Sequence, residues 1–415
     1  MRQLKGLVVI ISFLMFLGLM SLGHINEVQA HATLQTENPS SNSVVQNQPD
    51  NIELTFNEPV YTKHTTLNVY DDKGQKVAML KPNESGQSKI VTFNAKDIER
   101  GTYAIEWETV SLDGHQIDGK YQFSVGERTA DGISTQAPFY TQVDFWLGLS
   151  RFILQSGLLL LFGYYIVNRL VSLGGVPTYG SIAKSRGILS ILMMIAIATG
   201  ILYLMSLPND VITEILTLEF ATWRQFPFVI SIVVILILLI LFVLRDMEWI
   251  WYDFIAILIF LGLAMSGHAW AQSTPIYSII IRAIHLMGIA IWLGSIVYLI
   301  KYLMKQPKHS YVLILKDTIF KLNLTAVASI IVTGILMSID ATSFSAILTK
   351  ATPYTFLWLS KMVVTFTMMA MGAYQTFIVM NKERDIRKPM LYGELILGIG
   401  LICVGVIMSQ IEIPL

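Results

Sequence analysis

The sequence predicts two parts of different fold class: an extracytoplasmic β-sandwich, followed by an all-α domain of eight transmembrane helices. Hydrophobic residues make up 53% of the 415 residues and charged residues only 14%, which is too little polar surface for a water-soluble globule of this size. The charges are also unequally divided. Residues 31–145 hold 9 Lys and Arg against 16 Asp and Glu, whereas residues 146–415 hold 18 against 12. This composition argues against a soluble enzyme and against nucleic-acid binding by the acidic first part.

The first thirty residues have the pattern of a secretory signal. Arg2 and Lys5 precede an apolar run at about residues 7–22, and the small residue Ala30 closes the segment. We therefore expect cleavage after Ala30, which makes His31 the amino-terminal residue of the mature protein. The expected organisation is a signal peptide at 1–30, a β domain at 31–127, a linker at 128–144 and a membrane domain at 145–415.

The β domain is predicted from short alternations of apolar and polar residues. Segments 52–56, 66–70 and 103–107 alternate in this way, and turn-forming clusters rich in Asp, Asn and Gly separate them at 71–74 and 82–86. Several such strands within about a hundred residues indicate a small β-sandwich.

The membrane domain is predicted from apolar segments, each long enough to cross a hydrocarbon core of about 30 Å as a helix. Thirteen of the 18 Lys and Arg residues after residue 145 fall in the inner loops or inner helix ends of this arrangement. The positive-inside rule then places the β domain and the carboxyl terminus on the outer, periplasmic side of the cell (inner) membrane. The expected spans are 145–168, 187–207, 225–244, 250–268, 277–301, 321–339, 355–380 and 391–410.

A candidate metal site combines the new amino terminus with an internal motif. Asp113 and His115 stand two residues apart, so their side chains leave the same face of an extended segment. A freed His31 adds an α-amine and a ring Nδ1 that can chelate one metal ion together. Three nitrogens and one oxygen in a tetragonal plane suit Cu(II). Taken alone, Asp-Gly-His is also typical of a turn with a solvated histidine, and His64 is expected to be a surface residue.

The β domain resembles a known family on several motifs. They are His31-Ala32-Thr33-Leu34, Asn38-Pro39, residues 54–60 (LTFNEPV), Ser111-Leu112-Asp113-Gly114-His115, Gly119 and Phe123-Ser124-Val125. Together they are similar to CopC, a bacterial periplasmic copper-binding family, over nearly all of residues 31–127. The resemblance implies a cupredoxin-like or immunoglobulin-like sandwich in which His31, Asp113 and His115 hold Cu(II). The same ligands resemble the histidine brace of copper oxygenases, but a carboxylate ligand argues against oxygen chemistry, and we expect no enzyme.

Ionisable and soft side chains inside the spans mark a second candidate site. Met265 and His268 share a helical face near the outer end of the fourth span, and His285 lies about 12 Å deep in the fifth. Three interpretations are open: a copper relay through imidazole and thioether groups, axial ligation of a haem by His268 and His285, or buried hydrogen-bonding and packing pairs. Further candidates at similar depth are Met337, Asp340 and Lys361.

The membrane part resembles a second family through Ser266-Gly267-His268-Ala269, His285 with Trp292-Leu293-Gly294, and Lys361 after residues 354–360. These motifs are similar to CopD, a membrane protein that often accompanies CopC or is fused to it. The resemblance implies copper resistance or copper uptake.

We therefore expect a copper acquisition protein whose exported domain binds Cu(II) and passes copper to a membrane domain that moves it into the cell. Cu(I) is the expected form inside the membrane domain, because thioethers favour it. The alternatives are a haem-binding electron carrier or copper reductase, and copper sequestration without transport. The expected partners are copper ions, the lipid bilayer and an extracytoplasmic copper chaperone or reductase, with no nucleic acid.

Overall fold

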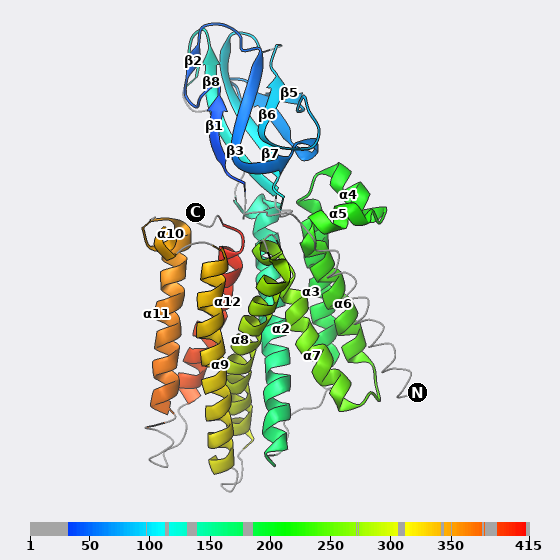
Figure 1. Cartoon of the computed structure of the whole chain (residues 1–415), viewed down its shortest axis with the longest axis vertical. Coiled ribbons are helices and arrows are strands. Elements are labelled where there is room, and N and C mark those ends of the chain that lie inside the picture. Colours follow the sequence, from blue (N-terminus) through cyan, green and yellow to red (C-terminus); the bar gives the residue numbers. More distant parts are fainter. Residues whose placement is uncertain are drawn as a thin grey trace. The chain divides into compact units, whose positions relative to one another are not determined.

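The computed structural model describes residues 32–96, 98–112, 116–130, 139–176, 186–270, 272, 274–305, 312–341, 344–349, 351–375, 377 and 388–411. Strands come first in the chain and long helices follow (Figure 1). The strands and most of the long helices fall into two separate compact units. The predicted order of a β domain and a helical domain is confirmed.

The strands form two sheets. One has the order β1-β3-β6 and the other the order β2-β8-β7-β4-β5, and neighbouring strands are antiparallel except β2 and β8. The strands are β1 (Leu34–Asn38), β2 (Val44–Val45), β3 (Asn51–Tyr61), β4 (Thr66–Tyr70), β5 (Lys76–Leu80), β6 (Gln87–Asn94), β7 (Gly101–Val110) and β8 (Gln116–Val125).

The core of the sandwich follows from the two-residue period of a strand. On β3, the side chains of Ile52, Leu54 and Phe56 are buried in one cluster, which the opposite sheet completes with residues such as Trp107. The rings of Phe56 and Trp107 meet edge to face with their centroids 5.3 Å apart, so they join the two sheets directly.

Trp107 also explains a glycine on the neighbouring strand. Gly119 of β8 pairs with Trp107 of β7, and a Cβ on Gly119 would lie 2.5 Å from Trp107 Cζ2. Only glycine leaves room for the indole at this position. The close fit keeps β7 and β8 in register up to the pair Val110 and Gln116, where the hairpin turns.

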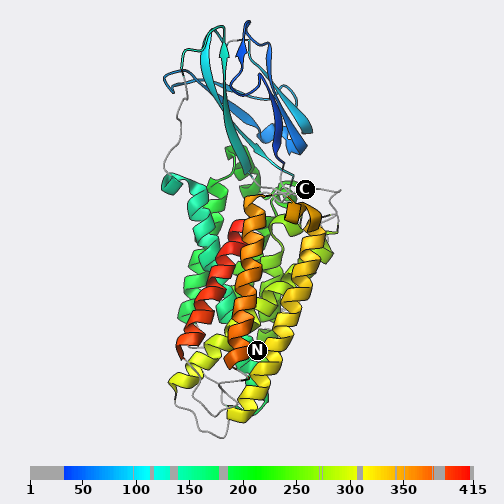
Figure 2. The same cartoon turned by 90° about the vertical axis from the view of Figure 1, so that its left-hand side faces the viewer.

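The helices of the second part run side by side (Figure 2). Short 3-10 turns η1 (Thr62–His64), η2 (Phe139–Thr141) and η4 (Gly267–Ala269) lie between the longer elements. The helices are α2 (Val143–Leu173), α3 (Arg186–Met205), α4 (Asn209–Leu216), α5 (Phe220–Gln225), α6 (Pro227–Val243), α7 (Trp249–Ala264), α8 (Pro275–Met304), α9 (Val312–Ala341), α10 (Phe344–Thr349), α11 (Pro353–Tyr374) and α12 (Lys388–Met408).

Six helices in the described part of the chain are long and apolar enough to cross a membrane: α2, α3, α8, α9, α11 and α12. The third and fourth predicted spans correspond to α6 and α7, which are apolar but have only 17 and 16 residues. The polar residues Arg245, Asp246 and Glu248 separate α6 from α7. At its other end, α7 stops before Gly267, whose φ is +67°. The number eight therefore stays a prediction.

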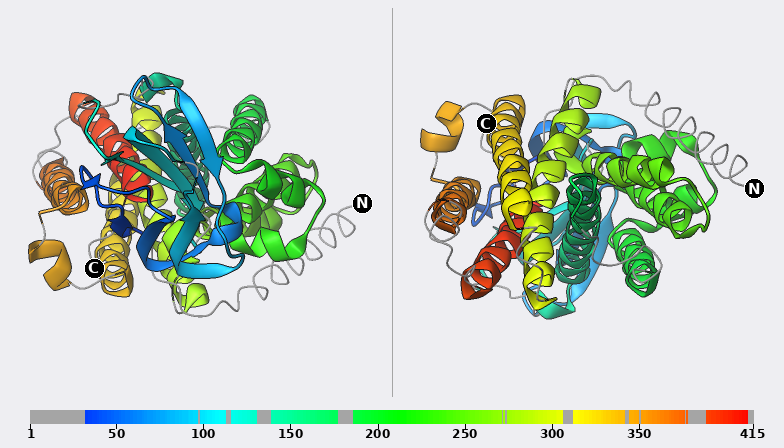
Figure 3. Two further views of the ribbon diagram at one scale, coloured as in Figure 1. Left: turned by 90° about the horizontal axis from the view of Figure 1, so that it is seen from above. Right: turned by 90° about the horizontal axis from the view of Figure 1, so that it is seen from below.

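Helix α8 is central to the bundle. It packs against α7, α9 and α12, and it crosses α2 at very short range (Figure 3). A Cβ on Gly163 of α2 would lie 1.9 Å from the carbonyl oxygen of Ala290, and one on Gly294 of α8 would lie 2.2 Å from the carbonyl carbon of Gly163. Small residues permit such close helix packing in membranes. The two glycines thus set the distance between α2 and α8.

The first and last long helices share one end of the bundle. Arg151 near the start of α2 donates a hydrogen bond of 3.2 Å to Ser409 Oγ, just after α12. Gln410 lies beside Gly148 of α2, because a Cβ atom added to Gly148 would be 3.2 Å from Gln410 Oε1. An even number of membrane crossings is consistent with this arrangement.

We predict that Gly294→Ala destabilises the membrane bundle, because the added methyl group meets the backbone of α2. Overpacking of this kind costs on the order of 2 kcal/mol. The matched control is Gly400→Ala on α12, where an added Cβ would meet nothing within 4 Å. The midpoint of thermal unfolding in detergent should fall for Gly294→Ala and stay near the wild-type value for Gly400→Ala. Equal midpoints for both variants would contradict the close crossing.

Candidate metal centre and polar seam of the membrane bundle

The three predicted Cu(II) ligands lie outside the described residues, but their neighbours in the chain are described. Asp113 and His115 belong to the connection between β7 and β8, whose last described pair is Val110 and Gln116. Just before them, Ser111 forms an isolated antiparallel bridge with Val60 of β3. Ser111, which directly follows β7, therefore lies beside the end of β3.

The residues that follow His31 are held by the same strand. Ala32 is buried, and the Thr33 amide donates a hydrogen bond of 2.6 Å to Asn57 Oδ1. In return, the Asn57 amide donates to the Thr33 carbonyl oxygen at 3.0 Å. Asn57 and Val60 are three residues apart on β3, which corresponds to about 10 Å along a strand. Strand β3 thus contacts both Thr33, near the start of the described chain, and Ser111, which follows β7.

His64 lies close to this region and corrects one expectation. It was expected at the surface, but the structure buries it, with 6% of its area exposed, in η1 after β3. Its ring meets Tyr61 edge to face at 6.2 Å, and the adjacent Thr65 hydroxyl is 2.7 Å from that of Thr109 on β7. The sequence pattern missed this, because a polar run of Tyr, Thr, Lys and His resembles an exposed loop.

The hairpin also carries an acidic face. Glu108 of β7 is paired across the strands with Asp118 of β8, and Glu106 is two residues away from Glu108. Burial raises the pKa of Glu108, and the negative charges of Asp118 and Glu106 raise it further. The Lys120 ammonium lies 4.0 Å from Glu106 Oε1 and balances part of this negative charge. An acidic surface of this kind attracts cations toward the hairpin.

Several predicted membrane residues meet along a polar seam between α8 and α9. Ser278 Oγ of α8 donates a hydrogen bond of 2.6 Å to Asp340 Oδ2 of α9. Deeper in the bundle, His285 Nδ1 and the Thr333 hydroxyl are 2.9 Å apart. Thr333, Met337 and Asp340 follow each other at helical spacing on one face of α9. The structure therefore brings His285, Met337 and Asp340 to one helix interface.

Positive charges surround this seam. The positive charges of Lys361 on α11 and Arg282 on α8 are close enough to interact electrostatically with His285. Arg282 interacts with Lys361 in the same way. Arg282 donates a hydrogen bond of 2.5 Å to the Ser266 carbonyl oxygen, next to the buried Met265. Neither Arg282 nor Lys361 forms an ion pair with a carboxylate in the described parts of the chain. A bare divalent cation would be repelled here unless sulfur or carboxylate ligands compensated.

The haem interpretation gains no support from this geometry. His268 belongs to η4, but its side chain is outside what the structure describes. His285 is engaged with Thr333, which fits the interpretation of a buried hydrogen-bonding pair. Across the described residues, no group of three or more His, Cys, Asp or Glu side chains is arranged to hold a metal ion.

The sequence reasoning also missed one buried acid. Glu394 of α12 exposes only 3% of its area and accepts a hydrogen bond of 3.1 Å from Gln375 Nε2. The signal was present, because a single carboxylate within an otherwise apolar segment marks a functional candidate.

Comparisons with known proteins agree with the division of the chain. Residues 34–126 match the family model described as CopC domain. Over the whole chain, the sequence is 24% identical to the copper transport protein CutJ of Bacillus subtilis (strain 168), covering 79% of that protein. Over 100 residues, or 24% of the chain, it is 36% identical to protein YobA of Escherichia coli (strain K12), covering 81% of that protein. It is also 28% identical over 25% of the chain to copper resistance protein C of Escherichia coli, covering 88% of that protein.

We predict a favourable coupling between His285 and Thr333 across the α8–α9 interface. Hydrogen bonds between membrane helices contribute about 0.6 kcal/mol on average in double-mutant cycles. Unfolding free energies of His285→Ala, Thr333→Val and the double variant in detergent should therefore give a coupling of about this size. Strict additivity of the two single substitutions would show that the pair contributes nothing to bundle stability.

Proposed function

Because the chain belongs to the CopC family through its amino-terminal domain, we propose that it captures Cu(II) outside the cell and passes copper to a membrane domain that moves it inward. The similarity to the copper transport protein CutJ over the whole chain supports a transport role for the helical part. In this proposal the protein is a transporter or transport accessory and not an enzyme.

The proposed Cu(II) ligands are His31, through its α-amine and ring, together with Asp113 and His115. The observation that carries this assignment is the convergence on β3: Thr33 is bound to Asn57, and Ser111 bridges to Val60. Cu(II) prefers a tetragonal set of nitrogen and oxygen ligands, which these three residues supply. The ligands must lose their protons, so binding should weaken as the pH falls.

The proposed path through the membrane uses the seam between α8 and α9. Met337 and His285 are soft or borderline ligands that favour Cu(I), and Asp340 supplies a negative charge among Arg282 and Lys361. Cu(II) must then gain one electron before it enters, which an extracytoplasmic reductase would supply, and an extracytoplasmic chaperone would deliver the copper. A single charge on Cu(I) also reduces the repulsion from the neighbouring cations.

In the proposed topology, the chain lies in the cell membrane with the CopC domain and the carboxyl terminus outside. The shared end of α2 and α12 supports an even number of crossings. The expected signal peptide and the distribution of Lys and Arg support the orientation.

The first prediction for this function concerns the amino terminus. One serine added before His31 separates the α-amine from the imidazole, so the chelate is lost. The affinity for Cu(II) should fall by at least about tenfold, or 1.4 kcal/mol, in a competition titration. A serine added after Leu415 is the control. An unchanged affinity together with an unchanged electron spin resonance spectrum would refute the terminal chelate.

The second prediction concerns transport. When radioactive copper is supplied together with a reductant as Cu(I), its uptake into vesicles that contain the full chain should be lost in Met337→Ala, because the seam loses its thioether ligand. Met194→Ala is the matched control, since this methionine on α3 is 70% exposed on the bundle surface. Uptake should be unchanged in the control. If uptake persists in Met337→Ala, or if the CopC domain alone confers it on cells, the proposed path is wrong.

A further inference from the structure

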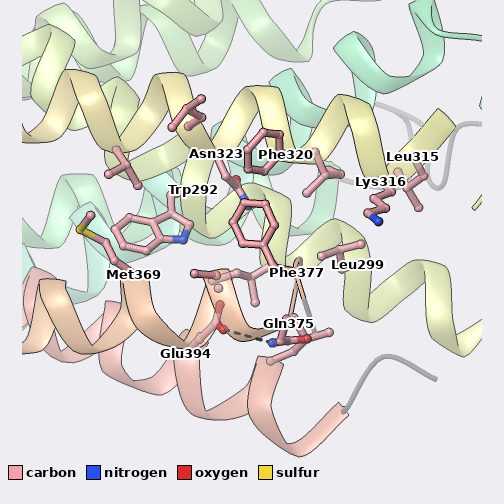
Figure 4. A pocket seen from close by; sticks show the side chains of 17 residues that line it. Trp292, Leu299, Leu315, Lys316, Phe320, Asn323, Met369, Gln375, Phe377 and Glu394 are labelled. Atoms are coloured by element: carbon pink, nitrogen blue, oxygen red, sulfur yellow. Dashed lines mark hydrogen bonds between the residues drawn. The ribbon is translucent and has the colours of Figure 1, made fainter. Parts of the chain in front are cut away.

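Four helices enclose a cavity of about 210 Å³ between α8, α9, α11 and α12. Its walls are mostly apolar, with aromatic side chains from Trp292, Phe320 and Phe377 (Figure 4). Glu394 and Gln375 lie on one side of the cavity, and Asn323 lies on the other. The copper assignments described above use none of these polar residues.

Glu394 is the central group of this cavity. Only 3% of its area is exposed, and it accepts a hydrogen bond from the neutral Gln375 amide, of which only 6% is exposed. No ion pair to Glu394 is found among the described residues. A buried carboxylate anion is costly unless a cation or a proton compensates its charge. The site therefore requires a positively charged ligand.

Asn323 provides a second, independent observation. Its Oδ1 atom is buried on the cavity wall with no hydrogen-bond partner in the described part of the structure. An unpaired buried acceptor requires a donor. The cavity thus presents oxygen acceptors from both α9 and α12, and a proton bound to a carboxylate there turns an acceptor into a hydrogen-bond donor.

The chemistry of the lining favours a proton over copper. The polar atoms that face Glu394 are amide groups, which are hard ligands, whereas Cu(I) prefers sulfur and imidazole. Among the described residues that line the cavity, Lys316 of α9 is the other charged one, and those from α8 and α11 are uncharged. Glu394 is therefore the acid of the cavity, with one lysine at its border.

The position of the cavity suits exchange with one side of the membrane. Glu394 comes six residues, or about 9 Å, after the start of α12 at Lys388. On α8, Trp292 of the cavity lies about 10 Å beyond His285. The cavity is therefore near the bundle end where α8 finishes and α12 begins, and the His285 seam is toward the other end.

We propose that this cavity is a proton-binding site in which the Glu394 carboxylate takes up a proton from the nearer side of the membrane to become the carboxylic acid and releases it to that side again. Proton exchange at Glu394 accompanies copper movement through the same bundle. The coupling to copper movement rests on the proposed function, whereas the proton site itself does not.

The proton site is tested with the full chain in vesicles and dicyclohexylcarbodiimide. This reagent adds to protonated carboxyl groups in apolar surroundings and leaves an N-acylurea, which mass spectrometry detects on the peptide. Glu394 should be labelled, increasingly as the pH falls, and Glu394→Gln should lose the label. Asp253 is the internal control, because its carboxylate accepts a hydrogen bond of 2.6 Å from Tyr165 and lies 3.7 Å from Arg169. No label on Glu394, or no more than on Asp253, overturns the proposal.

The coupling is tested on the same vesicles by radioactive copper uptake with and without an imposed pH gradient. Wild type and Asp253→Asn should respond to the gradient, and Glu394→Gln should lose that response. A response that persists in Glu394→Gln overturns the coupling. If wild type takes up no copper while Glu394 is labelled, the proposed transport function fails and the proton site stands.

Discussion

The contact of α2 with α8 at Gly163 and Gly294 is the constraint on which the membrane bundle depends. At this crossing the two backbones touch without side chains between them, so neither helix can shift without losing the contact. Helix α8 carries Arg282 and His285 toward one end and Trp292 toward the other. The polar seam with α9 and the cavity with Glu394 therefore keep their places because α8 is held by α2.

The two polar regions of the bundle have opposite character. Around His285 the charges are positive, from Arg282 and Lys361, and the ring is paired with the Thr333 hydroxyl. In the cavity the buried ionisable group is an acid, Glu394, whose hydrogen-bond partner is the neutral Gln375 amide. A path for a cation through this bundle meets a different electrostatic problem in each half. In the functions we propose, soft ligands address the first, and an exchangeable proton addresses the second.

Much of the architecture could be predicted from local patterns, and the failures have physical reasons. The alternation at Ile52, Leu54 and Phe56 specified a strand, because one face of β3 is buried against Trp107. The break between α6 and α7 was predicted, but their lengths were not: α7 ends at Ala264, before Gly267 with its φ of +67°, although the apolar run continues beyond that point. The burial of His64 depends on contacts with β7 that no local pattern contains.

The predicted Cu(II) site rests on one chemical event, the release of an α-amine next to an imidazole. Strand β3 holds Thr33 and faces the hairpin, but it cannot supply the amine itself. Amino-terminal sequencing of the protein isolated from its native membrane tests this directly. We predict that the mature chain begins with His31, followed by Ala32 and Thr33. A mature chain that starts at any other residue would contradict it, because the copper chelate would lack its terminal nitrogen.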